Sequence, residues 1–145
     1  MEQIHVKKLR PDAVLPTRGS ADAAGADLRA CMDGAVEIAP GETAFIGTGI
    51  AAEIPSGWGG FIFARSGLAC KQGLAPANKV GVVDADYRGE IKVALHNHSA
   101  SPVTVQPGDR IAQLVLLPVM MADFVETEEL CDTQRGEGGF GSTGK

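Results

Sequence analysis

Hydrophobic and polar residues alternate with a period of two in the most regular parts of the chain. In residues 91–96, the side chains of Ile91, Val93 and Leu95 would lie on one face of an extended segment, which is the pattern of a strand with one buried side. Residues 103–106 alternate in the same way. Further strands are predicted, between turn-forming residues, at 36–39, 43–54, 58–64, 79–83, 110–119 and 124–127.

Glycine and proline strengthen the prediction of a β-rich fold. The 145 residues include 19 glycines and 8 prolines, which favour many short elements joined by tight turns over long helices. A chain of this length forms one domain with its own core. We therefore expect an all-β fold, a jelly-roll-like sandwich or barrel of about eight or nine short strands, because closure limits the number of exposed sheet edges.

One short helix is expected directly after Arg65. Ser66 can cap the free backbone N–H groups of the first turn, and Gly73 can end the helix. Residues 20–28 are rich in alanine, but Gly25 disfavours a helix there by about 1 kcal/mol relative to alanine. We expect these residues to form a loop that leads into a strand.

The last residues form a different kind of segment. Residues 132–145 contain a single large apolar side chain, Phe140, among many glycines, so they cannot bury enough surface to fold alone. We expect a β-barrel domain over residues 1–131. Residues 132–145 are expected to form a flexible, glycine-rich C-terminal arm of the same domain, mobile until something orders it.

Charge and hydropathy exclude several classes of partner. The formal net charge is −5, with 18 acidic and 13 basic residues, which argues against nonspecific binding to nucleic acid or to an anionic membrane. Any anionic ligand would need locally placed cations. No segment reads as a targeting signal or a membrane span. The cysteines Cys31, Cys70 and Cys131 form no paired motif and suit the reducing cytoplasm, so a cytoplasmic protein is expected.

Two short motifs are candidates for binding and chemistry. Arg65, Ser66 and Gly67 at the start of the expected helix could bind an anion such as phosphate with a guanidinium, a hydroxyl and unpaired N–H groups. Alternatively, Ser66 only caps the helix and Arg65 lies in solvent. Asp84 follows the apolar residues 80–83, and a carboxylate at the end of a core strand is a candidate general base.

Other polar residues leave alternatives open. Asp86 is expected to stabilise a turn rather than to bind a metal. Tyr87 could pack in the core or a turn, or form a flat platform beneath a sugar or base. His96 and His98 would share a strand face, but no nearby third ligand completes a zinc site, so we expect surface histidines. Residues 139–145 match a phosphate-loop pattern without the Ser or Thr and helix that should follow, which leaves a closing strap or a disordered tail.

Five segments of the chain form an ordered set of motifs. They are residues 24–28, 64–69, 78–89, 107–114 and 135–144. Their content and order closely resemble those of the homotrimeric dUTPases, the deoxyuridine triphosphate pyrophosphatases, over nearly the whole chain. Ala26 stands where these proteins often have an aromatic residue, and Ala64 where they often have proline, but neither departure removes a chemical group.

The resemblance implies hydrolysis of dUTP to dUMP and pyrophosphate, with water attacking the α-phosphorus and Mg²⁺ chelated by the triphosphate. Asp84 would orient and deprotonate the water, while Asp27 and Gln113 would hold phosphate-bound and metal-bound waters. No side chain is expected to bind Mg²⁺ directly. Such an enzyme keeps uracil out of DNA and supplies dUMP for dTMP synthesis.

The resemblance also implies how the substrate is bound. An aromatic ring flat against the deoxyribose would leave no space for a 2′-hydroxyl, and a strand pair would read the uracil edge through its polar groups. The implied contact residues are Arg65, Ser66 and Gly67 for the phosphates, Tyr87 for the sugar, and Asn78, Gly81 and Val83 for uracil.

In the same family, each active site draws on three subunits of a homotrimer. The C-terminal arm would reach across from a neighbour and close over the substrate, with an aromatic ring stacked on uracil, so a monomer is expected to be inactive. The implied arm residues are Arg135, Phe140, Gly141 and Ser142.

Two other functions are compatible with parts of this pattern. A deoxycytidine triphosphate deaminase of the same fold shares the phosphate-binding elements, but the segment around Tyr87 and the complete glycine-rich arm favour a dUTPase. A non-catalytic trimer that binds nucleotides or regulates other proteins would not need a positioned general base. The joint presence of Asp84, Asp27, Ser66 and Arg135 argues against it.

Overall fold

The structure is a computed structural model that describes residues 3–139. Over these residues the predicted all-β fold with one short helix is confirmed, although its strands are more numerous and shorter than expected. The strands are β1 (His5–Lys8), β2 (Thr17–Arg18), β3 (Ala26–Arg29), β4 (Val36–Ile38), β5 (Thr43–Gly47), β6 (Ile50–Glu53), β7 (Trp58–Phe63), β8 (Leu74–Pro76), β9 (Gly81–Val83), β10 (Lys92–Asn97), β11 (Val103–Val105) and β12 (Arg110–Pro118), and the helix is α1 (Ser66–Gln72).

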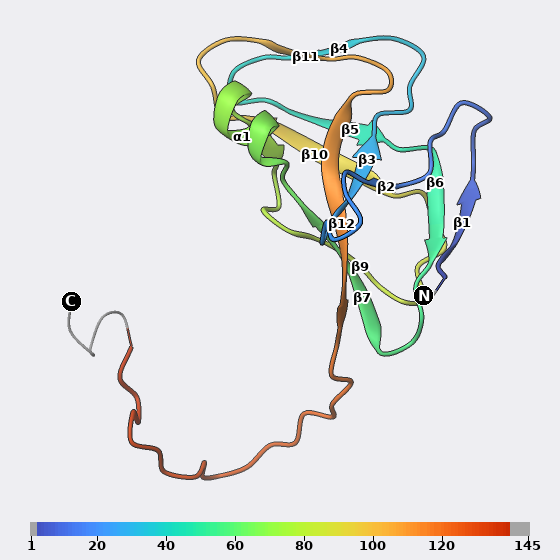
Figure 1. Ribbon diagram of the computed structural model, residues 1–145. Helices are drawn as coiled ribbons and strands as arrows, with labels where there is room; N and C mark the ends of the chain where they lie inside the picture. Colours follow the sequence, from blue (N-terminus) through green and yellow to red (C-terminus); the bar gives the residue numbers. More distant parts are fainter. Residues whose placement is uncertain (1–2, 140–145) are drawn as a thin grey trace.

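The strands pair into four antiparallel sheets (Figure 1). A five-stranded sheet has the order β2-β3-β12-β7-β9 and a three-stranded sheet the order β5-β10-β8, while β1 pairs with β6 and β4 with β11. The nine-residue strand β12 lies between β3 and β7. Because β12 pairs on both of its edges, it fixes the relative register of its two neighbours.

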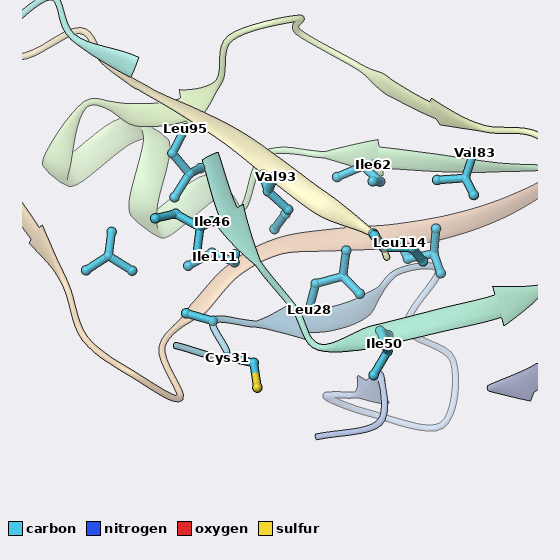
Figure 2. Close-up of a cluster of buried hydrophobic side chains, with 14 of the residues drawn as sticks. Leu28, Cys31, Ile46, Ile50, Ile62, Val83, Val93, Leu95, Ile111 and Leu114 are labelled. Atoms are coloured by element: carbon cyan, nitrogen blue, oxygen red, sulfur yellow. The ribbon is translucent and has the colours of Figure 1, made fainter. Parts of the chain in front are cut away.

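The hydrophobic core contains the alternating residues that the sequence points to. Ile91, Val93 and Leu95 are each at most 2% exposed, which confirms the predicted alternation. Figure 2 shows Val93 and Leu95 of β10 gathered with Leu28 of β3 and Ile111 of β12. Each such side chain contributes roughly 1.5–3 kcal/mol through burial, so this cluster holds β10 against the five-stranded sheet.

The single strand predicted over residues 43–54 is wrong, because the chain forms β5 and β6 with a break between them. Gly49 in the break has a φ of 66°, in the left-handed region that favours glycine. A Cβ atom at this position would lie 2.7 Å from Cys31 Sγ and 2.9 Å from Ala13 Cβ. The break allows β5 to pair with β10 while β6 pairs with β1.

The strand predicted over residues 79–83 begins only at Gly81, because the chain turns sharply before it. Lys79 has a φ of 66°, and the Val80 N–H donates to the Asn78 carbonyl at 2.7 Å, which closes a strained three-residue turn. The turn brings the Asn78 amide close to the strand, since a Cβ at Gly81 would lie 3.4 Å from Asn78 Nδ2.

The strand predicted over residues 124–127 is wrong. Residues 119–139 contain no strand or helix, and Figure 1 shows them leaving the fold at the end of β12. The Phe124 side chain is fully exposed. A run of residues with high β-propensity forms a strand only where it meets a sheet edge and an apolar surface, and the described part of a single chain places neither beside this segment.

The helix α1 occurs where the sequence predicts it, but Ser66 does not cap it. The N-cap residue is Arg65, with an extended backbone, and no side-chain hydrogen bond caps the helix. The predicted cap fails because Ser66 is already the first helical residue. Gly73 ends the helix as predicted, with a φ of 69° and its N–H donating to the Ala69 carbonyl. Within residues 3–139, no helix is long and apolar enough to cross a membrane.

The sequence does not predict three of the strands. These strands, β1, β2 and β8, have two to four residues each, too few for alternation to be recognised. Each is defined by its partner, because β1 pairs with β6, β2 with β3 and β8 with β10. In contrast, the alanine-rich residues behave as predicted, because residues 20–25 form a loop that leads into β3 at Ala26.

Asn97 at the end of β10 is a completely buried amide. Its Nδ2 donates to the carbonyls of Ile38 and Ser101, both at 2.8 Å. Its Oδ1 accepts from the N–H of Ser99 at 2.9 Å and from the hydroxyl of Ser99 at 2.7 Å. The amide therefore ties β10 to β4 and closes the turn that follows β10.

Replacing Asn97 by alanine should lower the free energy of unfolding by about 2–4 kcal/mol, because four hydrogen-bonding groups lose their partner in a buried site. The measurement is urea denaturation at one fixed protein concentration, with Gln106→Ala, an exposed amide, as the control. Equal stability of the two variants would contradict the role given to Asn97.

Candidate active site

The first part of the candidate site is built around the carboxylate of Asp27, which pairs with two arginines. In the register of the five-stranded sheet, Gln113 of β12 lies opposite Asp27 of β3 and opposite Phe63 of β7. Asp27 Oδ1 accepts from Arg65 Nε at 2.7 Å, and its Oδ2 accepts from Arg110 Nη1 at 3.2 Å. The Asp27 side chain is only 14% exposed, so this carboxylate holds two guanidinium groups in fixed positions.

Gln113 is fixed by its neighbours on both sides. Its Nε2 donates to the Ala64 carbonyl at 2.9 Å, directly before the residues that start α1. On the other side, a Cβ atom at Gly25 would overlap the Gln113 Oε1. The structure therefore brings together Asp27, Gln113 and Arg65, three of the residues that the sequence proposes for the site.

The start of α1 opens into a hollow of about 370 Å³. Arg65 and Gly67 line it together with Lys71, Arg110 and Asp109. The lining of this hollow therefore includes three cations and one carboxylate, Asp109. Arg65 is therefore held by Asp27 at the edge of this hollow and does not lie free in solvent, whereas Ser66 does not line the hollow.

A second hollow, of about 350 Å³, lies on the strands β9 and β10. Asp84 comes directly after β9, as predicted, and a turn follows in which the Tyr87 N–H donates to the Asp84 carbonyl at 3.1 Å. The predicted substrate contacts that line this hollow are Asn78, Gly81, Val83 and Tyr87. The base candidate and the predicted contacts for uracil and sugar therefore share one surface.

The Tyr87 ring lies on the surface of this second hollow. It is 46% exposed, which excludes the core position that the sequence leaves open. Its hydroxyl donates to the Glu90 carbonyl at 2.9 Å. The ring also lies against Gly89, where a Cβ atom would be 2.6 Å from Tyr87 Cζ.

The two hollows have no lining residue in common. The first hollow is lined by the cations Arg65, Lys71 and Arg110, which we call the cradle. The second hollow is lined by Asp84 and Tyr87. Arg135 lines neither of them, and its Nε donates to the Gly138 carbonyl at 2.7 Å. Phe140, Gly141 and Ser142 lie outside the described residues.

Two histidines lie at the end of β10, since His96 is in the strand and His98 directly follows it. The rings of His96 and His98 lie edge to face with their centroids 4.4 Å apart, and His96 Nδ1 is 2.8 Å from the Thr43 hydroxyl. In the part of the chain that the structure describes, no three His, Cys, Asp or Glu side chains lie together as metal ligands. The His96 side chain is partly buried and the His98 side chain is exposed.

Two residues of the site are not found by reasoning from the sequence. Arg110 pairs with Asp27, and Glu90 accepts the hydrogen bond of Tyr87. Both lie within or directly beside segments that the sequence singles out, but neither has a local pattern that marks its role. Only the contacts that they make in the folded chain reveal these two residues.

The structure is thus an antiparallel β-protein with one hollow lined by Arg65, Lys71 and Arg110 and a second hollow lined by Asp84 and Tyr87. A sequence model of the dUTPase family matches residues 12–144 of this chain. The chain belongs to the dUTPase family. The resemblance seen in the five sequence segments is thereby confirmed.

Individual relatives agree with this assignment. The chain is 54% identical over 131 residues to the deoxyuridine 5′-triphosphate nucleotidohydrolase of Desulfitobacterium hafniense. The aligned residues cover 90% of this chain and 87% of that protein. A mutant dUTPase of Staphylococcus bacteriophage 80alpha, solved with dUpNHpp, matches the structure with a TM-score of 0.92 at 28% identity and covers 100% of both chains.

A third relative is a mutant dUTPase from phage phi11 of S. aureus. It matches with a TM-score of 0.79 at 25% identity, over 88% of this chain and 98% of that one. Its structure is described as revealing the coordination of a structural Mg(II) ion. A coordinated divalent cation therefore occurs in a structural relative of this chain.

Gly25→Ala should displace the Gln113 side chain, because a methyl group at position 25 overlaps Gln113 Oε1. We expect kcat for dUTP to fall about tenfold, the scale expected for a misplaced site group, with pyrophosphate release as the measurement. The control is Gly34→Ala, where a Cβ atom meets nothing within 4 Å. If both variants kept full activity, the placement of Gln113 would not matter for turnover.

Proposed function

We propose that this chain hydrolyses dUTP to dUMP and pyrophosphate, with Asp84 as the general base and the cradle at the start of α1 holding the phosphates. Hydrolysis of dUTP is the activity of the family to which the chain belongs. The observation that carries the assignment of roles is the grouping of Asp84, Asn78 and Tyr87 around one hollow. A nucleoside placed there has its sugar and base near the proposed contacts and its phosphates near the carboxylate.

Asp84 activates the attacking water. Its carboxylate takes a proton from a water molecule as the water oxygen forms a bond to the α-phosphorus, and the bond from this phosphorus to the bridging oxygen of the β-phosphate breaks. The electron pair of the broken bond leaves with pyrophosphate, and the proton on Asp84 is later released to solvent. Asp84 is exposed at the end of β9, so a water molecule can reach it.

The phosphates are held by positive charge at the start of α1. Arg65 donates to Asp27 through Nε. Its two Nη groups are the donors that bind phosphate. The Ser66 hydroxyl, which does not cap the helix, and the Gly67 N–H are further donors. Phosphoryl transfer depends mainly on such positioning and charge neutralisation.

The donor set of the chain fits Mg²⁺ that is held mainly by the substrate. Among residues 3–139, no cluster of three or more acidic, His or Cys side chains could bind the ion. Asp27 lies at the cradle, and each of its oxygens keeps a lone pair for a water molecule besides its guanidinium partner. When bound, Mg²⁺ supplies charge neutralisation on the triphosphate.

Substrate specificity comes from the second hollow. The Tyr87 ring packs against the deoxyribose, so that a ribose 2′-hydroxyl has no space. The Asn78 amide and the backbone of β9 at Gly81 and Val83 pair with the uracil edge. Cytosine presents the opposite donors and acceptors at two positions, which leaves buried polar groups unpaired at roughly 1–3 kcal/mol each.

The complete site is built by a homotrimer. Within one chain, the cradle and the Asp84 hollow are lined by different residues. Association places the cradle of one subunit against the Asp84 hollow of the next, and a chain of this size thereby encloses a nucleotide without a second domain.

The segment between β12 and the C-terminal arm, residues 119–131, supports this assembly. Apolar side chains in it are 82–101% exposed in the single chain, and they are Met120, Met121, Phe124, Val125 and Leu130. Burial of apolar area contributes about 25 cal/mol per Å², so this segment gains stability by packing on a neighbouring copy. Arg135 and, beyond the described residues, Phe140, Gly141 and Ser142 then close over the substrate of that neighbour.

The state of the cysteines suits the proposed cytoplasmic location. Cys31, Cys70 and Cys131 are free thiols. Cys31 is buried, and burial together with its hydrogen bond to Asp12 raises the pKa of the thiol, which keeps it protonated and unreactive. Free thiols of this kind persist in a reducing compartment.

Asp84→Asn tests the proposed mechanism. The amide can still orient a water molecule but cannot accept its proton, so kcat should fall by about 10²–10⁴-fold, while the Kd for dUTP changes by no more than about threefold. Asp86→Asn in the same turn is the control and should retain most activity. A kcat for Asp84→Asn close to that of the control would refute the assignment of the base.

A further inference from the structure

The orientation of the Tyr87 ring depends on two contacts within its own loop. A side chain at Gly89 would collide with the ring, since a Cβ there would lie 2.6 Å from Tyr87 Cζ. The Tyr87 hydroxyl donates to the backbone carbonyl of Glu90 at 2.9 Å. Tyr87 is 46% exposed, so few other side chains pack on its ring and these two contacts largely set its orientation. The Glu90 carbonyl fixes the hydroxyl end of the ring.

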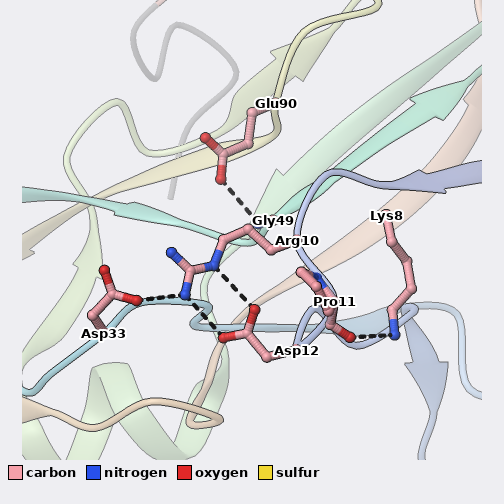
Figure 3. A network of polar contacts seen from close by, with 7 residues as sticks. All are labelled: Lys8, Arg10, Pro11, Asp12, Asp33, Gly49 and Glu90. Carbon is pink, nitrogen blue, oxygen red and sulfur yellow. Dashed lines mark hydrogen bonds and ion pairs between the residues drawn. The ribbon is translucent and has the colours of Figure 1, made fainter.

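Glu90 is itself anchored through its side chain. Its Oε1 accepts a hydrogen bond from the Gly49 N–H at 2.9 Å (Figure 3), and its Oε2 lies 3.6 Å from Lys92 Nζ. A Cβ at Gly47 would be 2.6 Å from the same Oε1. Gly47, the last residue of β5, therefore leaves the space that the carboxylate occupies, and the Gly49 N–H in the break between β5 and β6 donates to it.

The anchor at Gly49 is rigid. Its left-handed backbone is packed against Cys31 and Ala13, and its carbonyl accepts from the Leu9 N–H at 2.7 Å. A hydrogen bond from a backbone N–H to a carboxylate is stronger than one between neutral groups. The link therefore runs from a fixed bend in the chain, through the Glu90 side chain and backbone, to the Tyr87 hydroxyl.

We propose that Glu90 is a positioning residue for substrate selection: its carboxylate, held by Gly49, fixes the Tyr87 ring at the angle that excludes ribose. This inference rests on the proposed role of Tyr87 as the sugar platform. The peptide group that joins Glu90 to Ile91 has a second support, because the Ile91 N–H donates to the Ile50 carbonyl at 2.9 Å. The Ile91 carbonyl accepts from the Thr48 N–H at 3.2 Å. Loss of the carboxylate therefore loosens the Tyr87 loop without unfolding β10.

The test compares kcat/KM for dUTP and for UTP in four variants of the full chain. Glu90→Ala removes the anchor and should lower the dUTP-to-UTP ratio about tenfold, equal to about 1.4 kcal/mol of discrimination. Glu90→Gln keeps an oxygen acceptor for the Gly49 N–H and should restore the ratio to within about threefold of the unmodified chain. Glu37→Ala removes an exposed carboxylate on β4 and should leave the ratio unchanged.

Tyr87→Phe breaks the same link at its other end and should lower the ratio by a similar factor. It also keeps the test decisive if Glu90→Ala does not fold. When both substitutions are combined, the ratio should fall no further than with either one, because they break one chain of contacts.

Two results would overturn the inference. One is a Glu90→Ala variant in which dUTP and UTP turnover fall by the same factor, which indicates a purely structural role. The other is a Tyr87→Phe variant with an unchanged ratio. Failure of the proposed function looks different, because then the unmodified chain itself would not discriminate between dUTP and UTP, or Tyr87→Ala would leave the discrimination intact.

Discussion

The pairing of β12 with two strands at once is the constraint on which the rest of the structure depends. Gln113 on β12 lies opposite Asp27 on one side and opposite Phe63 on the other. Residues opposite each other in antiparallel strands share a face of the sheet, so a carboxylate and an amide stand beside the residues that lead into α1. A slip of one residue would turn these side chains to the other face and expose buried residues such as Leu114. The pattern that builds the core therefore also places the site.

Asp27 shows how an acidic chain can gather cations in one place. The protein has a net charge of −5, but its largely buried carboxylate at position 27 holds two guanidinium groups, Arg65 at 2.7 Å and Arg110 at 3.2 Å. Pairing reduces the cost of placing these cations close together and fixes their orientation. Lys71 on α1 adds a third cation to the same hollow. Local charge, and not the charge of the whole molecule, is what a triphosphate would meet.

The sequence predicts the elements whose signals are local and misses those that depend on distant partners. The alternation in residues 91–96 and the glycine that ends α1 are local, and both predictions are confirmed. The break at Gly49 could not be predicted, because it arises from close packing against residues far away in the chain. The strand predicted at 124–127 does not form, because a strand needs a sheet edge to pair with and the local sequence cannot show whether one is present. In the site, the ordered motifs point to Asp27 and its neighbours, whereas the part played by Glu90 is visible only in the fold.

The central claim is that one chain carries two incomplete halves of the site, which neighbouring copies join. Asp84→Asn damages one half and Arg65→Ala the other, so the two inactive variants can be unfolded, mixed in equal amounts and refolded together. If sites form between subunits, about one quarter of them combine two intact halves, and about a quarter of the dUTP turnover of the unmodified protein should return. A mixture of Asp84→Asn with Tyr87→Ala, both in the same hollow, should show no such gain. Activity in the first mixture no higher than the mean of its two components would contradict the account.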